Sequence, residues 1–239
     1  MRISVCIPTY NGEKYIKEQL VSILDQLSLD DEIIISDDSS TDNTIHVVKS
    51  IQDSRIKLFE NNKFKSPIFN LENALKLAQG DVLFLSDQDD IWKPDKVKIT
   101  LEKLKSVDLV VSDCELIDET NQIISESFYK LNSTKPGFVN NLMKNGFLGC
   151  CLAFNLKIKE SVLPFPKNIA MHDIWIGLVA SLLGRVIFID DKLIQYRRHG
   201  GNFSFTSSKS KFSLFYKIQY RMIFFNQAIK RFLQVKFFR

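Results

Sequence analysis

Apolar and polar positions follow two different rhythms along the first 112 residues. Short runs rich in β-branched and other apolar residues cover residues 3–7, 32–36, 55–59, 82–86 and 109–112. Between these runs, apolar residues recur three and four positions apart, the spacing of one helix face, as from Tyr15 to Leu24 and from Ile68 to Ala78. Short strands separated by helices predict an α/β fold with a mostly parallel, Rossmann-like sheet and helices on both faces.

This rhythm weakens beyond residue 113. Residues 120–148 are polar, with a turn signal at Pro136-Gly137, and we expect irregular structure there. The following block predicts a strand at 150–154, a helix at 172–183, and two short strands at 186–189 and 193–197. The chain has no internal repeat and no low-complexity linker, so we expect one compact domain over residues 1–205, followed by a tail over 206–239.

The tail of residues 206–239 has a helical pattern of its own. From 215 to 232 its apolar side chains fall on one helix face, at Phe215, Ile218, Met222, Phe225, Ile229 and Phe232. Residues 192–239 contain no acid and carry a net charge of +11, whereas residues 1–191 carry −7. A basic amphipathic helix with an aromatic face is typical of binding in the plane of an anionic membrane. The alternatives are packing on the rest of the chain and a dimer interface.

Composition narrows the class of protein further. The 239 residues are 45% apolar and 25% charged, as in a globular protein with a sizeable core. The sequence has no long apolar run that predicts a membrane-spanning helix and no secretory leader, so we expect a cytoplasmic protein. The cysteines lack CxxC spacing and indicate buried thiols in a reducing compartment, rather than a zinc site or disulfides; they are Cys6, Cys114, Cys150 and Cys151.

Three carboxylates lie within four residues at the end of the fourth predicted strand, in Asp87-Gln88-Asp89-Asp90. Deprotonated carboxylates this close repel one another, and a bound cation is the usual compensation. Hard oxygen ligands select Mg²⁺ or Mn²⁺, and Mg²⁺ commonly shares its coordination sphere with substrate phosphates. The alternative is a solvated acidic turn before the helix that starts near Pro94, with Asp90 as the N-cap.

Polar residues also follow the first two predicted strands, at Pro8-Thr9-Tyr10 and Asp37-Asp38. Ligands of parallel α/β sheets bind at the carboxyl ends of the strands, so we expect these segments to share a site with the acidic run. Neither GxGxxG nor GxxxxGK followed by Ser or Thr occurs, which argues against a dinucleotide-binding fold and a P-loop NTPase. A pyrophosphate bound here would need a metal on the acidic motif in place of a glycine-rich loop.

Several motifs together carry a resemblance. Residues 7–11 (Ile-Pro-Thr-Tyr-Asn), Asp37-Asp38 and the stretch from Asp87 to Pro94 resemble, in order and spacing, the family 2 glycosyltransferases, inverting enzymes of the GT-A fold. The acidic run with Ile91-Trp92, then residues 172–175 and 196–200, is most similar to the rhamnosyltransferase-like branch of bacterial surface-polysaccharide synthesis. The resemblance covers residues 1–203 and implies a nucleotide-binding half (1–112) and an acceptor-binding half (113–205).

On the donor side, the resemblance implies a nucleobase pocket and a metal site. Pro8, Tyr10 and Asp38 would line the pocket, with Tyr10 on the base and Asp38 accepting from the base imide. Asp89 would be the direct metal ligand, for Mn²⁺ or Mg²⁺, and Asp87 a secondary ligand or a contact to the ribose. His199 is a candidate third ligand, on a loop that Gly200-Gly201 makes flexible.

Four more residues are candidates for binding the nucleotide sugar. Arg197 and Arg198 would add charge against the phosphates. Gln88 lies within the acidic run, and Asn70 stands, with Lys63 and Lys65, where relatives often carry an arginine.

On the acceptor side, Asp173 matches the family's catalytic base, which takes the proton of the attacking hydroxyl. Many relatives have Glu-Asp where this chain has His172-Asp173, so Asp173 is the only carboxylate at this point. The alternative for Asp173 is an acid at a helix N-terminus. Trp92 and Trp175 are candidates for stacking on acceptor sugars, with packing in the core as the alternative.

The resemblance therefore implies a metal-dependent inverting glycosyltransferase. Its donor would be dTDP-rhamnose or a UDP-hexose, its acceptor a lipid-linked saccharide, and its location the inner face of the membrane, with oligomerisation left open. One alternative is a nucleotidyltransferase, although residues 8–12 do not form the glycine- and basic-rich phosphate loop that such enzymes use. A second is a non-catalytic, membrane-tethered binding module. The acidic body argues against nucleic-acid binding.

Overall fold

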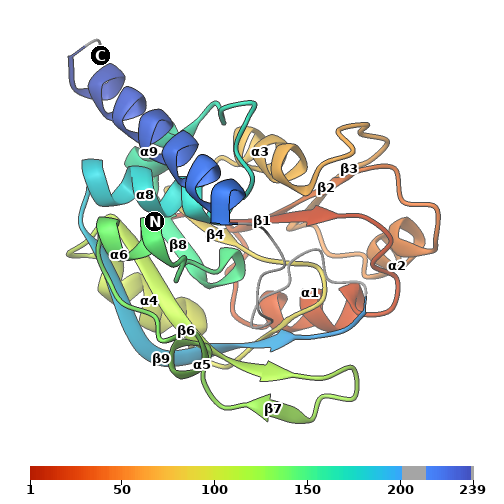
Figure 1. The fold of residues 1–239 in the computed structure, drawn as a ribbon. Helices are drawn as coiled ribbons and strands as arrows, with labels where there is room; N and C mark the ends of the chain where they lie inside the picture. Colours follow the sequence, from red (N-terminus) through yellow and green to blue (C-terminus); the bar gives the residue numbers. More distant parts are fainter. Residues whose placement is uncertain (201–213, 238–239) are drawn as a thin grey trace.

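The computed structural model describes residues 1–200 and 214–237 (Figure 1). The described strands form one nine-stranded sheet in the order β3-β2-β1-β4-β8-β6-β9-β5, with β7 paired to β6. The strands are β1 (Ile3–Thr9), β2 (Glu32–Asp37), β3 (Ile56–Phe59), β4 (Val82–Leu85), β5 (Ile91–Trp92), β6 (Leu109–Ile117), β7 (Ile123–Ser125), β8 (Leu152–Asn155) and β9 (Val186–Arg197). The helices are α1 (Ile16–Leu24), α2 (Thr44–Ser50), α3 (Pro67–Leu77), α4 (Lys96–Leu104), α5 (Phe128–Asn132), α6 (Phe138–Met143), α7 (Leu156–Val162), α8 (His172–Leu183) and α9 (Leu214–Phe237).

The first half has the predicted βαβ architecture. Strands β3, β2, β1 and β4 run parallel, and Cys6 at the centre of β1 pairs with Ile34 of β2 and Leu85 of β4. Every residue of β2 and of β4 is buried, as expected for strands covered on both faces. The predicted α/β fold is confirmed, and the carboxyl ends of β1, β2 and β4 lie side by side at one edge of the sheet.

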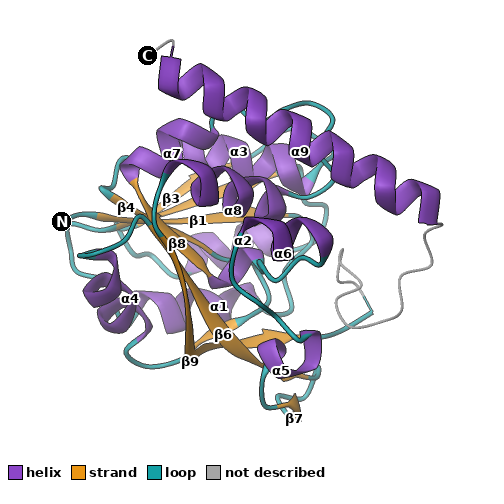
Figure 2. Cartoon of the chain, turned by 60° about the vertical axis from the view of Figure 1, so that its left-hand side comes forward, coloured by secondary structure: helices purple, strands orange, loops and turns teal. Residues whose placement is uncertain are grey.

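Helices cover both faces of the sheet (Figure 2). Helices α3, α7 and α8 lie on one face, and α1 and α4 lie on the other. Helix α9 packs across α8 as an outer layer. Where the chain turns into α3, Pro67 takes the first helical position, in which its missing N–H costs no hydrogen bond.

The second half is more regular than the sequence predicts. Residues 120–148 contain β7, α5 and α6, so the expectation of irregular structure was wrong. The two short strands expected after residue 185 are one continuous strand, β9. It pairs in parallel with β6 and absorbs the intervening Asp190-Asp191 as a register shift opposite Ser112 and Asp113. Alternation along the chain did not reveal this pairing because a β-bulge interrupts the period of two.

Helix α9 confirms the predicted helix in the tail. Phe224 and Ala228 are buried against the domain. The guanidinium of Arg231 donates to the carbonyls of Ser161, Leu163 and Pro164, all within 2.9 Å. One side of the helix therefore packs on the rest of the chain. None of the described helices is long and apolar enough to cross a membrane. The predicted boundary at 205 and 206, and the side chain of Phe215, lie outside the described residues.

Candidate active site

The residues after β1 and β4 are joined by a two-way hydrogen bond. The side chain of Gln88 accepts from the backbone N–H of Tyr10 at 2.9 Å and donates to the carbonyl of Tyr10 at 3.0 Å. This bond fixes the loop after β1 and leaves the Tyr10 ring 56% exposed, open to a planar ligand. Pro8 lies beneath this loop, within β1. Gln88 thus holds the backbone of Tyr10 in place through both hydrogen bonds.

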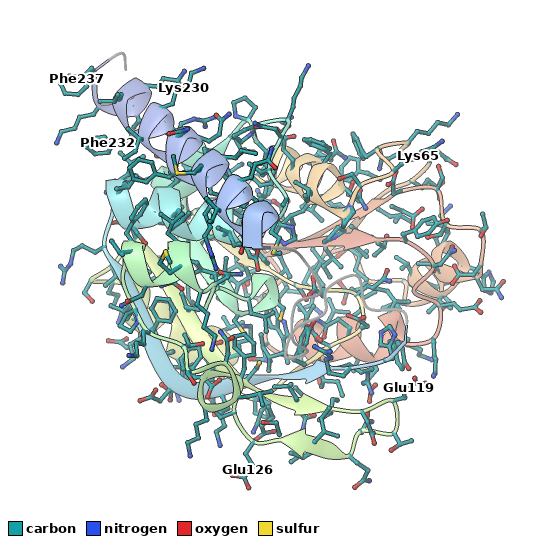
Figure 3. The ribbon with its side chains drawn as sticks, viewed as in Figure 1. Lys65, Glu119, Glu126, Lys230, Phe232 and Phe237 are labelled. Carbon is teal, nitrogen blue, oxygen red and sulfur yellow. The ribbon has the colours of Figure 1, made fainter. Side chains whose placement is uncertain are left out.

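Asp38, after β2, organises the loop that leads into α3. Its carboxylate accepts from the backbone N–H groups of Phe64 at 2.6 Å and Ser66 at 3.2 Å. Asn70, on α3, is buried and donates to the carbonyl of Thr9 at 3.1 Å. Its Oδ1 has no hydrogen-bond partner among the described residues. Lys63 and Lys65 are exposed on the same loop, and Lys65 extends away from the domain in Figure 3.

The acidic run turns two of its carboxylates into the protein. Oxygens of Asp87 and Asp90 and the sulfur of Cys150 all lie within 4.8 Å of one another. Asp90 is 1% exposed; its Oδ1 accepts from the backbone N–H of Arg197 at 3.0 Å, while Oδ2 has no hydrogen-bond partner among the described residues. Asp90 is therefore not the solvated N-cap of the alternative, because it is buried and α4 begins at Lys96 with Asp95 as its N-cap residue.

Burial and mutual repulsion shift the ionisation of this cluster. Burial, with added repulsion from Asp89 and Asp173, raises the pKa of Asp87 to about 7. Burial, with repulsion from Asp89 and Asp87, raises the pKa of Asp90 well above its ordinary value. Buried carboxylates with an unfilled acceptor atom are the donor set that a hard divalent cation prefers, so the residues present fit a metal.

Asp89 pairs with His199, the histidine predicted to share its metal. Nε2 of His199 lies 2.7 Å from Oδ2 of Asp89, and the imidazole packs against the ring of Tyr15 with centroids 5.1 Å apart. Asp89 is 8% exposed. The structure thus brings together two predicted metal ligands that are 110 residues apart in the sequence. Gly200 has open space around its α-carbon, and Gly201 lies outside the described residues.

Arg197 was predicted to face the donor phosphates, but its side chain is enclosed by the protein. Its guanidinium is buried over the ring of Tyr15 and forms an ion pair with Glu18 at 2.8 Å. It also donates to the carbonyl of Asp89 at 2.8 Å and to the side chain of Asn121. The charge expected to face the donor phosphates is instead used inside the protein, where it fixes the backbone of the acidic run. Arg198, the next residue, is partly exposed.

Asp173 lies in the first turn of α8. Its Oδ2 accepts from Nδ2 of Asn145 at 3.1 Å, and its Oδ1 accepts from the backbone N–H of Ile174 at 2.7 Å. Burial raises the pKa of Asp173, with hydrogen bonds and His172 opposing the shift. Burial lowers the pKa of His172, so the imidazole is neutral near pH 7 and leaves Asp173 without a neighbouring cation there.

The two tryptophans are core residues, and their predicted contact with the acceptor was wrong. Trp175 is fully buried, and its indole N–H donates to the carbonyl of Val162 at 2.9 Å. Two residues after Asp173 on a helix, it points to the opposite side, toward Arg231 of α9. Trp92 is 3% exposed and packs against Phe84. Neither ring has a face free for a sugar.

Three contributors to the site had no signal in the sequence. Asn145 lies in the polar stretch taken as irregular, and Cys150 has no ligand-like spacing. Lys96 is 1% exposed, with Nζ 5.0 Å from the centre of the Trp92 ring, and burial lowers its pKa. All four cysteines are buried and free, as predicted. The candidate site combines the half-buried Asp173, a carboxylate cluster and the exposed Tyr10.

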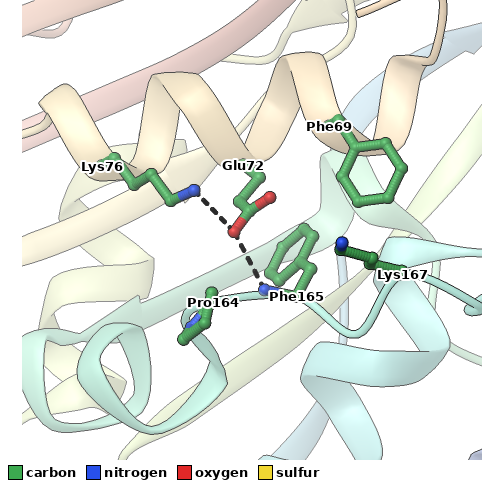
Figure 4. A pocket seen from close by; sticks show the side chains of 6 residues that line it. All are labelled: Phe69, Glu72, Lys76, Pro164, Phe165 and Lys167. Atoms are coloured by element: carbon green, nitrogen blue, oxygen red, sulfur yellow. Dashed lines mark hydrogen bonds and ion pairs between the residues drawn. The ribbon is translucent and has the colours of Figure 1, made fainter.

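A separate hollow lies between α3 and residues 164–167 (Figure 4). Its volume is about 430 Å³, and it is open to solvent. Glu72 crosses it, paired with Lys76 at 2.8 Å and accepting from the backbone N–H of Phe165 at 3.0 Å. None of the predicted site residues lines it. The hollow is therefore separate from the candidate site at the strand ends.

Residues 4–161, two thirds of the chain, match the family described as glycosyl transferase family 2. The chain belongs to this family. The assignment confirms the predicted glycosyltransferase and decides against the nucleotidyltransferase and the non-catalytic binding module.

Two curated relatives show the range of family members that this chain is similar to. The dTDP-rhamnosyl transferase RfbG of Shigella flexneri is 29% identical over 245 residues, covering 89% of this chain and 80% of that protein. An Escherichia coli glucosyltransferase, WfgD, is 31% identical over 150 residues, covering 62% of this chain and 57% of that protein. WfgD is named as a β-1,3-glucosyltransferase from UDP-Glc to α-D-GlcNAc-diphosphoundecaprenol.

Solved structures confirm the GT-A fold. Staphylococcus aureus TarS 1–349 in complex with UDP-GlcNAc superimposes with a TM-score of 0.67 at 18% identity, covering 99% of this family 2 glycosyltransferase and 76% of the TarS 1–349 chain. The mannosyltransferase PcManGT of Pyrobaculum calidifontis, in complex with GDP-Man and Mn²⁺, gives a TM-score of 0.61 at 21% identity, covering 96% of this chain and 64% of that one. At these identities the likeness concerns the fold.

Proposed function

We propose that this glycosyltransferase is metal-dependent and inverting, and that it transfers a sugar from a nucleoside diphosphate to a hydroxyl group of a lipid-linked saccharide. One observation carries the proposal. Asp173 is a half-buried carboxylate in the first turn of α8, and Asn145, on a separate loop, donates to it at 3.1 Å. A base is thus available beside the acidic cluster but on a different element of the fold, as a displacement from the opposite side of a sugar requires.

The donor side is proposed as follows. The exposed ring of Tyr10 stacks on the nucleobase, and the acceptor capacity left on the Asp38 carboxylate receives the base imide. Asp89 and His199, whose side chains lie 2.7 Å apart, would hold the metal, and Asp87 would be a secondary ligand. A bound Mn²⁺ or Mg²⁺ would supply Lewis-acid stabilisation of the charge on the departing diphosphate. The names of RfbG and WfgD favour dTDP-rhamnose and UDP-hexoses as the donors to test.

In the transfer step, the acceptor oxygen forms a bond to the anomeric carbon while the bond from that carbon to the diphosphate oxygen breaks. The electron pair leaves with the nucleoside diphosphate, and the proton of the acceptor hydroxyl passes to Asp173. Asn145 holds Oδ2 of Asp173 and thereby sets the direction of the carboxylate. Because burial raises the pKa of Asp173, this carboxylate is a stronger base than an exposed aspartate.

The acceptor is proposed to be a polyprenyl-diphosphate-linked saccharide at the cytoplasmic face of the membrane, in bacterial surface-polysaccharide synthesis. The similarity to WfgD, which is named for a diphosphoundecaprenol-linked acceptor, supports this substrate class.

A panel of nucleotide sugars tests the proposal. dTDP-rhamnose, UDP-glucose, UDP-galactose and UDP-GlcNAc are each incubated with the protein and a polyprenyl-diphosphate-linked GlcNAc, in the presence of Mn²⁺, Mg²⁺ or EDTA. We expect turnover of one donor that EDTA abolishes, and a product whose anomeric configuration, read by NMR, is opposite to that of the donor. Retained configuration would contradict the assignment of Asp173 as the base, and turnover unaffected by EDTA would contradict the metal.

A further inference from the structure

Helix α9 has a second apolar side that nothing in the described structure covers. Its buried residues, Phe224 and Ala228, face the domain. On another side, Ile218, Met222 and Phe225 are 51%, 54% and 40% exposed, and the same row continues toward the C-terminus with Leu233 at 45% and Phe237 at 67%. Figure 3 shows Phe232 and Phe237 on the part of α9 that extends beyond the domain. A helix that served only to pack on its own domain would not need this row.

Helix α6 extends the exposed row onto the domain. Val139 is 69% exposed and Met143 is 57% exposed. The two helices touch, because Phe138 packs edge-on against Phe225 and the Arg221 guanidinium donates to the carbonyl of Met143. Together these side chains form one apolar surface from two helices, which we call the α6–α9 face: Val139, Met143, Ile218, Met222, Phe225, Leu233 and Phe237.

The charged side chains of the two segments that form the α6–α9 face are all basic. Residues 127–159, which contain α6, have no aspartate or glutamate and include five lysines. Residues 192–239, which contain α9, have no acid either. Among the exposed cations are Lys144, beside α6, and Lys230 and Lys236 on α9. A second copy of the chain would meet this positive surface with an equal one, whereas an anionic lipid headgroup layer complements it.

The α6–α9 face also adjoins the acceptor side of the active site. Met143 ends α6, and Asn145, two residues later, donates to the Asp173 carboxylate. Two residues of chain span about 7 Å at most. A surface resting against α6 therefore lies close to the proposed base.

We infer that the α6–α9 face binds the surface of an anionic bilayer and thereby presents the lipid-linked acceptor to Asp173. The inference rests on the proposed function for the identity of the acceptor, but the binding itself does not depend on it. Apolar side chains enter the interfacial region, the lysines meet the phosphates of the headgroups, and α9 lies in the membrane plane without crossing it.

The test measures partition of the full chain onto vesicles, without donor or acceptor. Vesicles of phosphatidylcholine with about one third phosphatidylglycerol are compared with pure phosphatidylcholine, at low and high salt. We expect at least ~10-fold stronger partition onto the anionic vesicles and a clear loss at high salt. Equal partition onto both vesicles, or none onto the anionic ones, would overturn the inference.

Matched variants locate the surface. Met222→Glu on α9 and Val139→Glu on α6 each exchange an exposed apolar residue for an acid, and Leu29→Glu makes the same exchange at a position that is 88% exposed and distant from both helices in the sequence. We expect the first two to lose at least ~10-fold in partition and Leu29→Glu to match the parent protein. Sedimentation of each protein adds a further arm: a dimer that Met222→Glu dissociates would reassign the face to a second copy and overturn the inference.

Transfer to a water-soluble acceptor separates this inference from the proposed function. If the face acts only on the membrane, Met222→Glu keeps the parent's rate on a short-chain acceptor and loses rate on the same acceptor embedded in vesicles. If the parent transfers no sugar in either format yet partitions as expected, the proposed function fails and the bilayer surface stands.

Discussion

Two groups of carboxylates lie at the ends of β2 and β4, the strands on either side of β1, and their surroundings are opposite. After β2, Asp37 accepts from the hydroxyls of Thr9 and Ser40 and from the Ser40 N–H, all within 2.9 Å. Burial alone would raise the pKa of nearby Asp42, but hydrogen bonds from Thr44 and Glu13 bring it below its ordinary value. After β4, the same chemical group has a raised pKa and, at Asp90, an acceptor atom without a partner.

The difference separates structural carboxylates from those available to a ligand. Asp37 and Asp42, at the end of β2 and in the loop after it, obtain their hydrogen bonds by folding alone. The cluster after β4 reaches the same state only if a cation or a proton arrives, because its nearest neighbours are other carboxylates and a thiol. Carboxylates with raised pKa values beside an acceptor atom that lacks a hydrogen-bond partner are typical of functional sites. The four predictions that follow test this contrast between the two groups of carboxylates.

The largest expected effect belongs to the base. Asp173→Asn keeps the shape of the side chain and removes its ability to take a proton. We expect turnover to fall by about 10³-fold, within the range typical of general-base catalysis, with donor affinity unchanged within about twofold. Turnover comes from product formation and affinity from titration calorimetry with the donor. Turnover within tenfold of the parent protein would end the assignment of Asp173 as base.

The next effect concerns the metal. Asp89→Ala removes the carboxylate that lies 2.7 Å from His199. We expect the Mn²⁺-dependent part of nucleoside diphosphate binding to fall by about 100-fold or more, since metal-site affinity depends on each direct ligand. Calorimetric titrations with and without Mn²⁺ measure it. Asp37→Asn is the matched control, and Mn²⁺-dependent binding that survives Asp89→Ala would place the ion elsewhere.

The stability of Asp37→Asn, compared with that of Asp87→Asn, tests the same contrast. Asp37→Asn loses charge-assisted hydrogen bonds in a buried loop, so we expect the free energy of unfolding to drop by about 2 kcal/mol. Asp87→Asn, in the incompletely satisfied cluster, should leave the metal-free protein as stable as before or more stable, because it removes a repelling charge. Denaturant unfolding of both variants checks the pair. A stability loss in Asp87→Asn as large as that in Asp37→Asn would erase the distinction.

The smallest effect is a dependence on pH. An acid whose pKa is raised by folding disfavours the folded state once it ionises, so stability declines as pH rises from the unfolded value of 3.8 to the folded value of about 7 for Asp87. We expect the Tm of the metal-free protein to fall by a few degrees between pH 5.5 and 7.5. Mn²⁺ should raise Tm more at pH 7.5, where the carboxylates are ionised. A Tm that rises over this window without metal would contradict the assigned pKa.

The sequence could predict those parts of the site that follow directly from strand ends. Asp38, Asp87 and Asp89 come after apolar runs, and parallel strands bring their carboxyl ends to one edge. His199 and Asp173 came only from the family resemblance, since nothing in their spacing joins residues so far apart. Membership in the family is established, whereas the individual roles of these residues remain predictions to be tested as above.

Side-chain direction was the part that the sequence could not supply. Arg197 lies two residues before His199 in a basic motif, yet its guanidinium turns inward, over the ring of Tyr15 and toward Glu18. Trp175 follows Asp173 by two residues, which on a helix is nearly half a turn away. Asn145 and Lys96 were missed because each acts through a tertiary contact, with Asp173 and with the Trp92 ring respectively.

The contacts of Arg197 also indicate the order in which parts of the protein fold. It bonds to Asp89 and Glu18 across 108 and 179 residues of chain, so these contacts close very long loops. Contacts of that separation form slowly, whereas the βαβ units of residues 1–112 pair with near neighbours. On the ribosome, β4, which precedes Asp87, is complete about a hundred residues before β9, which ends at Arg197, begins to emerge. The nascent chain therefore holds its acidic run without its internal cation until those residues have been made.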